Sequence, residues 1–201
     1  MAVPNLLPAI TERLHAHNLK PIATLVTHGH LDHTFSVTPL CKGYDIPAYV
    51  HKTDSKLIAD PFKILIPGGP IDSLLKDFGT LEFTNPDELI AFEDKFKINI
   101  AGFDIVAHHA PGHTAGSATF VVNDEFLIAG DVLFAGAIGR TDLPSGSSAD
   151  MKVSLRNKIL PLADELIVLP GHGPQTTIGR ERKNNPYLQE DFLNSPSVKG
   201  E

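Results

Sequence analysis

Four potential metal ligands stand within six residues directly after a short apolar run, and this segment constrains the fold more than any other. Residues 22–27 predict a strand, and the sequence Thr-His-Gly-His-Leu-Asp-His that begins at Thr27 then supplies His28, His30, Asp32 and His33. The intervening glycine permits a tight turn, so these side chains can project from one compact loop. Because clustering imidazoles without a cation gains little, the segment predicts a metal site at the end of a strand.

Three further loops repeat this arrangement of an apolar run followed by one histidine or aspartate beside glycine. His113 stands in Ala-Pro-Gly-His-Thr-Ala-Gly-Ser, Asp131 in Ala-Gly-Asp-Val and His172 in Leu-Pro-Gly-His-Gly. The loops together bring the set to five imidazoles and two carboxylates. This donor set is sufficient for two divalent ions, with one carboxylate bridging them.

These motifs, spread over about residues 5–188, resemble the metallo-β-lactamase-fold hydrolase superfamily, and most of all its small glyoxalase II-like (hydroxyacylglutathione hydrolase-like) members. The resemblance implies an α/β fold, the four-layer αββα sandwich, with two divalent ions, zinc or else iron or manganese. It implies that His28, His30 and His113 bind one metal, that Asp32, His33 and His172 bind the other, and that Asp131 bridges them. A bridging hydroxide completes the implied site, with Asp32 and Asp131 as the catalytic candidates.

The resemblance also sets expectations for the ends of the chain. Family members usually begin with strands that precede the first helix, whereas here that helix is expected at residues 5–18, so the N-terminal strands are expected to be missing. We expect a single metallo-β-lactamase-like domain over residues 1–188 and a polar tail that frays over residues 189–201.

The coarse pattern between the motifs predicts alternating helices and strands, then crowded strands joined by hairpins. Residues 60–96, rich in proline and glycine, are expected to form an irregular insertion bordering the mouth of the site. Expected helices cover residues 5–18, 34–42 and 148–160, and expected strands cover 48–51, 97–101, 103–109, 118–122, 125–130 and 165–169, with turns at 101–102 and 123–124.

Composition excludes several classes of protein. The 201 residues carry a net charge of −7 without a basic run, which disfavours binding to nucleic acid or an anionic membrane. The N-terminus lacks the pattern of a signal peptide and no apolar run could span a bilayer, so a cytoplasmic location is expected. The lone Cys41 excludes a disulfide framework and is expected to be a small buried residue rather than a nucleophile.

The leading functional hypothesis is a binuclear hydrolase that cleaves small-molecule S-(hydroxy)acyl thiols of the S-lactoyl type. A mononuclear iron persulfide dioxygenase and a lactone hydrolase remain the alternatives on the same fold, although Pro-Gly-His172-Gly looks more like the hydrolases. A scaffold with a lost site is disfavoured because all seven ligand positions are filled. Only 29 residues follow His172, too few for the helical domain that contacts glutathione in larger glyoxalase II enzymes, so a weak glutathione preference is expected.

Several other polar residues near the motifs have either two possible roles or an expected structural role. Arg140, in Gly-Arg-Thr-Asp, could orient a carboxylate or make a structural salt bridge. His108 and His109 are expected to pack or to support the ligands rather than to bind metal. The basic residues Arg180, Arg182 and Lys183 could meet a substrate carboxylate, but a solvated basic face is favoured.

Overall fold

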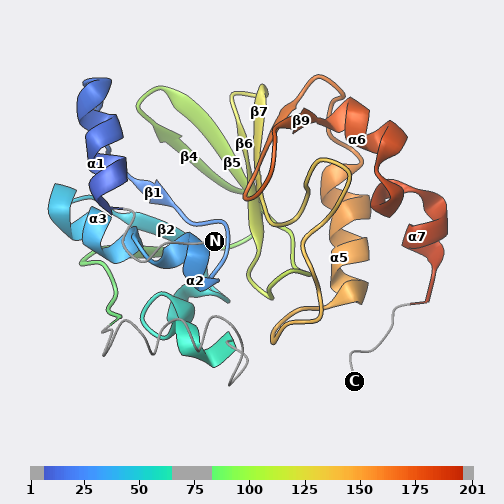
Figure 1. Cartoon of the computed structure of the whole chain (residues 1–201), viewed down its shortest axis with the longest axis horizontal. Helices are drawn as coiled ribbons and strands as arrows, with labels where there is room; N and C mark the ends of the chain where they lie inside the picture. The colour runs from blue at the N-terminus through green and yellow to red at the C-terminus, as the bar shows by residue number, and fades with distance from the viewer. Residues whose placement is uncertain (1–6, 65–82, 197–201) are drawn as a thin grey trace. The chain divides into compact units, whose positions relative to one another are not determined.

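The computed structural model describes residues 7–64 and 83–196. The chain divides into two compact units between Phe92 and Glu93 (Figure 1). Each unit contains its own sheet and its own apolar core.

The first unit contains a three-stranded parallel sheet with the order β1-β2-β3. Its elements are α1 (Leu7–Ala16), β1 (Thr24–Leu25), α2 (Leu31–Thr34), α3 (Val37–Tyr44), β2 (Ala48–His51), two 3-10 turns (Ser55–Leu57 and Pro61–Ile64) and β3 (Leu89–Phe92). The expected first strand is thus only two residues long, and the expected second helix begins early, as two short helices.

The core of this unit forms where α3 covers the central strand. Ala48 and Val50 of β2 are fully buried, and Val37 and Cys41 of α3 lie in the same apolar cluster. Burying such side chains contributes roughly 25 cal/mol for each Å² of apolar surface removed from water. Cys41 therefore belongs to the core, as its position in the sequence predicts.

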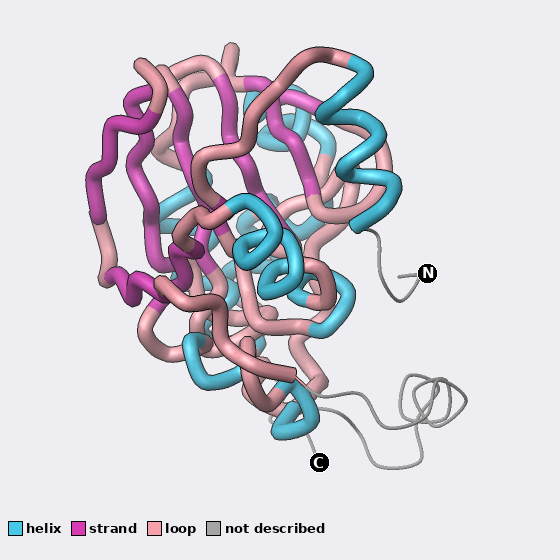
Figure 2. The backbone as a smooth tube through the Cα atoms, turned by 90° about the vertical axis from the view of Figure 1, so that its left-hand side faces the viewer, coloured by secondary structure: helices cyan, strands magenta, loops and turns pink. Residues whose placement is uncertain are grey.

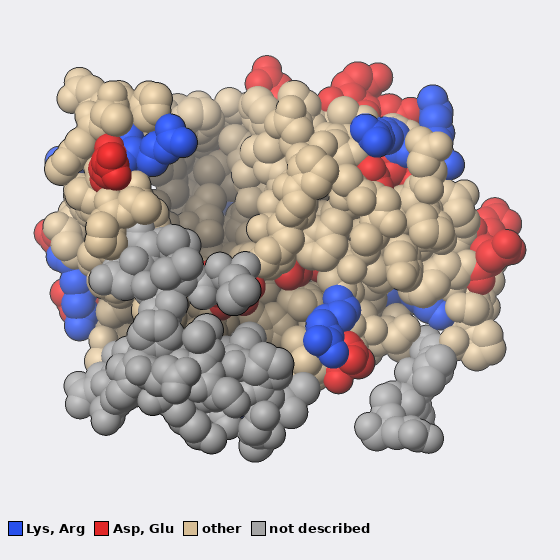
Figure 3. Space-filling model, in the orientation of Figure 1, with Lys and Arg blue, Asp and Glu red and all other residues tan. Residues whose placement is uncertain are grey.

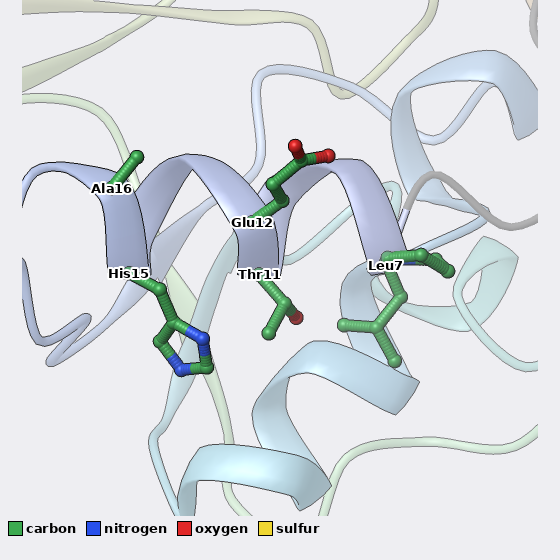
Figure 4. A pocket seen from close by; sticks show the side chains of 6 residues that line it. Leu7, Thr11, Glu12, His15 and Ala16 are labelled. Carbon is green, nitrogen blue, oxygen red and sulfur yellow. The ribbon is translucent and has the colours of Figure 1, made fainter.

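Helix α1 lies on the surface and has no buried residue. Its side chains border a shallow depression, in which Leu7, Thr11 and His15 project from one side of the helix and Glu12 from the other (Figure 4). The spacing of four residues explains the shared side.

One expectation about residues 60–96 is wrong. Residues 89–92 form β3, a regular strand that pairs in parallel with β2 in the register Ala48↔Leu89 to His51↔Phe92. The pairing partner lies some forty residues earlier in the sequence, so the strand is stabilised by a distant neighbour rather than by a local pattern. Residues 83–88 contain no helix or strand, in keeping with the expectation, and residues 65–82 of the expected insertion lie outside the described residues.

The second unit contains a six-stranded sheet with the order β4-β5-β6-β7-β8-β9, whose strands run side by side (Figure 2). All neighbours are antiparallel except β7 and β8, which are parallel. The strands are β4 (Phe96–Ile100), β5 (Phe103–His109), β6 (Ala118–Val122), β7 (Phe126–Gly130), β8 (Ile167–Pro170) and β9 (Thr176–Thr177). The expected hairpins are confirmed, and both turns use residues with positive φ, Ala101 with Gly102 and Asn123 with Asp124.

Helices cover one face of this sheet (Figure 1). They are α5 (Ser148–Ser154), continued by a π-helical turn (Leu155–Ile159), then α6 (Ile178–Asn184), a 3-10 turn (Pro186–Leu188) and α7 (Glu190–Asn194). The expected polar tail is thus ordered as far as α7, because Leu193 is buried in the core beside Leu188. No helix within residues 7–64 and 83–196 is long and apolar enough to cross a bilayer.

Candidate metal centre

The four candidate ligands of the first unit gather in the loop after β1 and on α2. The ring of His28 meets the ring of His30 edge-on at 5.0 Å between centroids and lies 4.1 Å from that of His33. His33 Nε2 is 3.6 Å from Asp32 Oδ2. His28 and His30 are buried, so the two imidazoles are held in one compact cluster as the sequence predicts.

A buried carboxylate that the sequence reasoning missed supports this loop. Asp54 Oδ2 accepts a hydrogen bond of 2.8 Å from the backbone N–H of Gly29, which stands between His28 and His30. Asp54 follows β2, which is parallel to β1, so the two loops leave the same edge of the sheet. Nothing in the sequence around Asp54 signals this role, because the donor lies 25 residues away.

Strand direction explains why His113, Asp131 and His172 meet in the second unit. β5 is antiparallel to β6, β6 is antiparallel to β7, and β8 is parallel to β7, so β5, β7 and β8 run in one direction. The three residues follow the carboxyl ends of these three strands, and those ends share one edge of the sheet. Topology therefore brings together three residues scattered over 60 positions of the sequence.

Asp131 stands between the two histidines of this edge. Its Oδ2 lies 3.4 Å from His113 Nε2 and 3.5 Å from His172 Nε2. Asp131 and His113 are buried, whereas about half of the His172 side chain is exposed. One carboxylate oxygen thus faces two imidazole nitrogens, the arrangement expected of a carboxylate shared by two metal sites.

The orientation of His113 is fixed by the loop that contains Arg140. His113 Nδ1 donates a hydrogen bond of 2.8 Å to the carbonyl oxygen of Arg140, since a carbonyl can only accept. In the neutral imidazole this hydrogen bond selects the tautomer with the proton on Nδ1, which leaves the lone pair on Nε2, the atom that faces Asp131. A backbone carbonyl or carboxylate holding the other ring nitrogen is the usual support of a metal-binding histidine.

Two glycines let the backbone pack closely around His113. A Cβ on Gly139 would lie 2.0 Å from the carbonyl oxygen of Asp131 and 3.0 Å from His113 Nδ1. Gly112 has φ +145°, and a Cβ there would lie 2.4 Å from the Cα of Met151 on α5. The Pro-Gly-His-Thr loop is thereby pressed against α5, where Ser154 Oγ also donates to Pro111 O at 2.7 Å.

Three of the other polar residues that the sequence singles out, Arg140, His109 and Arg182, have structural partners. The exposed Arg140 side chain makes two hydrogen bonds to Asp142, of 2.7 and 2.6 Å, which lower the pKa of that carboxyl to about 2. His109 Nε2 donates to Ala115 O at 2.9 Å and so helps to hold the His113 loop. Arg182 bonds to the carbonyl oxygens of Leu160 and Leu162 and pairs with Asp164, so it is a structural residue.

The thiol of Cys41 is unsuited to nucleophilic attack. The residue is 2% exposed, and burial raises the pKa of the thiol, opposed by its hydrogen bond to Thr24. A raised pKa keeps the thiol protonated near neutral pH, and the thiolate is the reactive form.

These features define a fold and a donor set typical of metal-dependent hydrolases, and comparison of the sequence gives the same class. The sequence model of the metallo-beta-lactamase superfamily matches residues 6–172. An uncharacterized protein of Mycobacterium tuberculosis is 41% identical over 183 residues, covering 88% of this chain and 80% of that protein. A hydroxyacylglutathione hydrolase of Haemophilus influenzae, GloC, is 34% identical over 183 residues, covering 89% and 81%.

Solved structures show the same relationship. The B3 metallo-beta-lactamase BLEG-1 matches with a TM-score of 0.78 and 34% identity, over 93% of this chain and 86% of that chain. The protein TTHA1623, solved in a di-iron-bound form, matches with a TM-score of 0.72 and 30% identity, over 93% and 87%. The chain belongs to the metallo-beta-lactamase superfamily and has its fold.

Proposed function

We propose that the chain is a binuclear metal-dependent thioesterase that cleaves S-(hydroxy)acyl thiols of the S-lactoyl type. The seven proposed ligands are His28, His30, Asp32, His33, His113, Asp131 and His172. The observation that carries the proposal is the position of Asp131 Oδ2, within 3.5 Å of two histidine Nε2 atoms.

The donor set fits divalent ions such as zinc, iron or manganese. Imidazole and carboxylate are their ordinary ligands, and seven of them exceed what one tetrahedral ion accepts. Orientation of His113 by a backbone carbonyl is the support that such a ligand needs. Two ions held by these residues would supply a water of lowered pKa and would polarise the thioester carbonyl.

The residues of the chain would position these reactants. The buried Asp131 is held close to His113 by the backbone packing at Gly139, and so presents a fixed carboxylate. Hydrolysis adds the oxygen of water to the carbonyl carbon and breaks the carbon–sulfur bond, which yields a carboxylate and a thiol. No serine or cysteine nucleophile is required, and the buried Cys41 is in keeping with this route.

The substrate class is argued from the relatives and from surface charge. The Haemophilus influenzae relative is named a hydroxyacylglutathione hydrolase, which favours an S-acyl thiol. On the face shown in Figure 3, basic side chains lie beside acidic ones rather than in one basic patch, which favours a small molecule over nucleic acid or a membrane. A cytoplasmic location, predicted from the sequence, belongs to the same proposal.

The test is steady-state kinetics of the zinc-loaded protein on a matched panel of substrates. We expect hydrolysis of S-lactoyl conjugates of several thiols with only weak preference for glutathione, and loss of activity in Asp131→Ala but not in Cys41→Ala. Selective hydrolysis of a lactone, or of a β-lactam as the name of BLEG-1 suggests, would contradict the substrate class. Oxygen consumption with a persulfide would contradict hydrolysis itself.

A further inference from the structure

A buried carboxylate in the second unit has no part in the proposed ligand set. Glu181, in the first turn of α6, is 2% exposed. It accepts three hydrogen bonds, from the hydroxyl of Thr176 (2.6 Å), the N–H of Gly136 (2.7 Å) and the side-chain amide of Asn185 (2.9 Å). All three donors are neutral, and they offset the cost of burying the carboxyl group; Thr176 and Asn185 are near Glu181 in the sequence, whereas Gly136 lies 45 residues away.

Asn185 makes further hydrogen bonds to the loop that contains Gly136. It is fully buried, and its amide nitrogen also donates to the carbonyl oxygens of Phe134 (3.3 Å) and Ala137 (3.1 Å). Gly136 has φ +74°, a conformation that favours glycine. We call Thr176, Glu181 and Asn185 the clamp. The side chains of Glu181 and Asn185 bond to the main chain of residues 134–137, and Thr176 bonds to Glu181.

The clamp is connected to His172 in two ways, through a ring contact and through the chain. The ring of Phe134 meets the ring of His172 edge-on, with 6.1 Å between centroids. Thr176 belongs to β9, and His172 lies in the short connection from β8 to β9. About half of the His172 side chain is exposed, and an exposed side chain rotates freely unless a contact orders it. The Phe134 ring supplies such a contact for the imidazole.

We propose that Glu181, acting with Asn185, is a positioning residue that holds the imidazole of His172 ready to bind metal. Glu181 fixes the backbone of residues 134–137, which places the Phe134 ring against His172, and it anchors the β9 end of the His172 connection. The inference rests on the proposed function only in taking His172 as a metal ligand, and it requires no particular substrate.

The experiment compares zinc affinities of the full-length protein by competition with a chelator. In Glu181→Met the carboxylate is lost, so we expect one of the two zinc ions to bind about 10- to 100-fold more weakly while the other changes little. Glu181→Gln should retain near wild-type affinity, because its amide oxygen can accept from Gly136 and Asn185 while its NH₂ group donates to the Thr176 hydroxyl. Thr176→Val, which removes one bond of the clamp, should have an intermediate effect.

Lys152→Met is the matched control. Lys152 is a buried charge of the same unit, and its ammonium group bonds to Ser195 at the end of α7 rather than to the clamp. The control should lower thermal stability and leave both zinc affinities unchanged. Equal loss of zinc in Lys152→Met and Glu181→Met, or wild-type affinities in Glu181→Met, would overturn the role of Glu181.

The affinity measurement also separates this inference from the proposed function. Wild-type protein that binds zinc as expected but hydrolyses no thioester would contradict the proposed substrate and leave the clamp standing. Should Glu181→Met fail to fold, Thr176→Val and Glu181→Gln still test the inference, which is overturned if Thr176→Val binds both ions as tightly as Glu181→Gln does.

Discussion

At the scale of single residues, close backbone packing determines where ligand atoms lie. Gly139 is a case in which the position of two proposed ligands depends on the absence of a side chain. The loop after Asp131 returns so closely that a Cβ on Gly139 would lie 2.0 Å from the Asp131 carbonyl oxygen, and the neighbouring Arg140 carbonyl accepts the hydrogen bond from His113 Nδ1. A methyl group at Gly139 would displace both ligands together.

We therefore predict that Gly139→Ala destabilises the protein by about 1–3 kcal/mol through overpacking and weakens metal binding. Gly43→Ala in α3 is the control, because a Cβ there meets nothing within 4 Å, and it should be neutral or stabilising by about 0.5–1 kcal/mol. Urea unfolding and metal analysis of both variants measure these effects. Normal metal content in Gly139→Ala would show that the packing does not determine the site.

At the scale of elements, parallel strands bring supporting residues to the loops of their neighbours. Asp54, after β2, supports the loop after β1 through Gly29. We predict that Asp54→Ala costs about 1–3 kcal/mol of stability, because it leaves a buried N–H without this acceptor, and that it weakens metal binding by the 28–33 loop. Asp54→Asn keeps an acceptor oxygen and should be affected less; equal losses in stability and metal binding would contradict this role.

Strand β5 provides a prediction about pH. Burial and the nearby Lys158 and Lys95 lower the pKa of His108 below 6.5, against the opposing effect of Asp94. The unfolded chain then takes up this proton more readily, so the stability contributed by neutral His108 is complete above about pH 6.5 and is lost as the pH falls. His108→Gln should reduce the change in the urea midpoint between pH 7 and pH 5.5. A change in midpoint equal to that of the wild-type protein would contradict the lowered pKa of His108.

Helices and strands are predictable from the sequence where the local residue pattern determines them. They are not predictable where pairing with a distant strand determines them. The strands before His113, Asp131 and His172 were predictable because each is an apolar run that ends in a turn and a ligand. Strand β3 was not, because it follows a proline- and glycine-rich stretch and is stabilised by β2. Glu181 was hidden among basic residues that suggested a solvated face, and only the tertiary fold reveals its partners.

At the scale of the whole molecule, the number of bound metal ions tests the ligand assignment. We predict close to two equivalents of zinc per chain at saturation, because seven nitrogen and oxygen donors exceed the needs of one tetrahedral ion. Since an ion that binds only the folded chain stabilises it by mass action, removal of metal by a chelator should abolish activity and lower the Tm. Added zinc should restore both, with a Tm that rises with zinc concentration. Elemental analysis and thermal unfolding measure these effects, and a single equivalent at saturation would contradict the assignment of seven ligands to two ions.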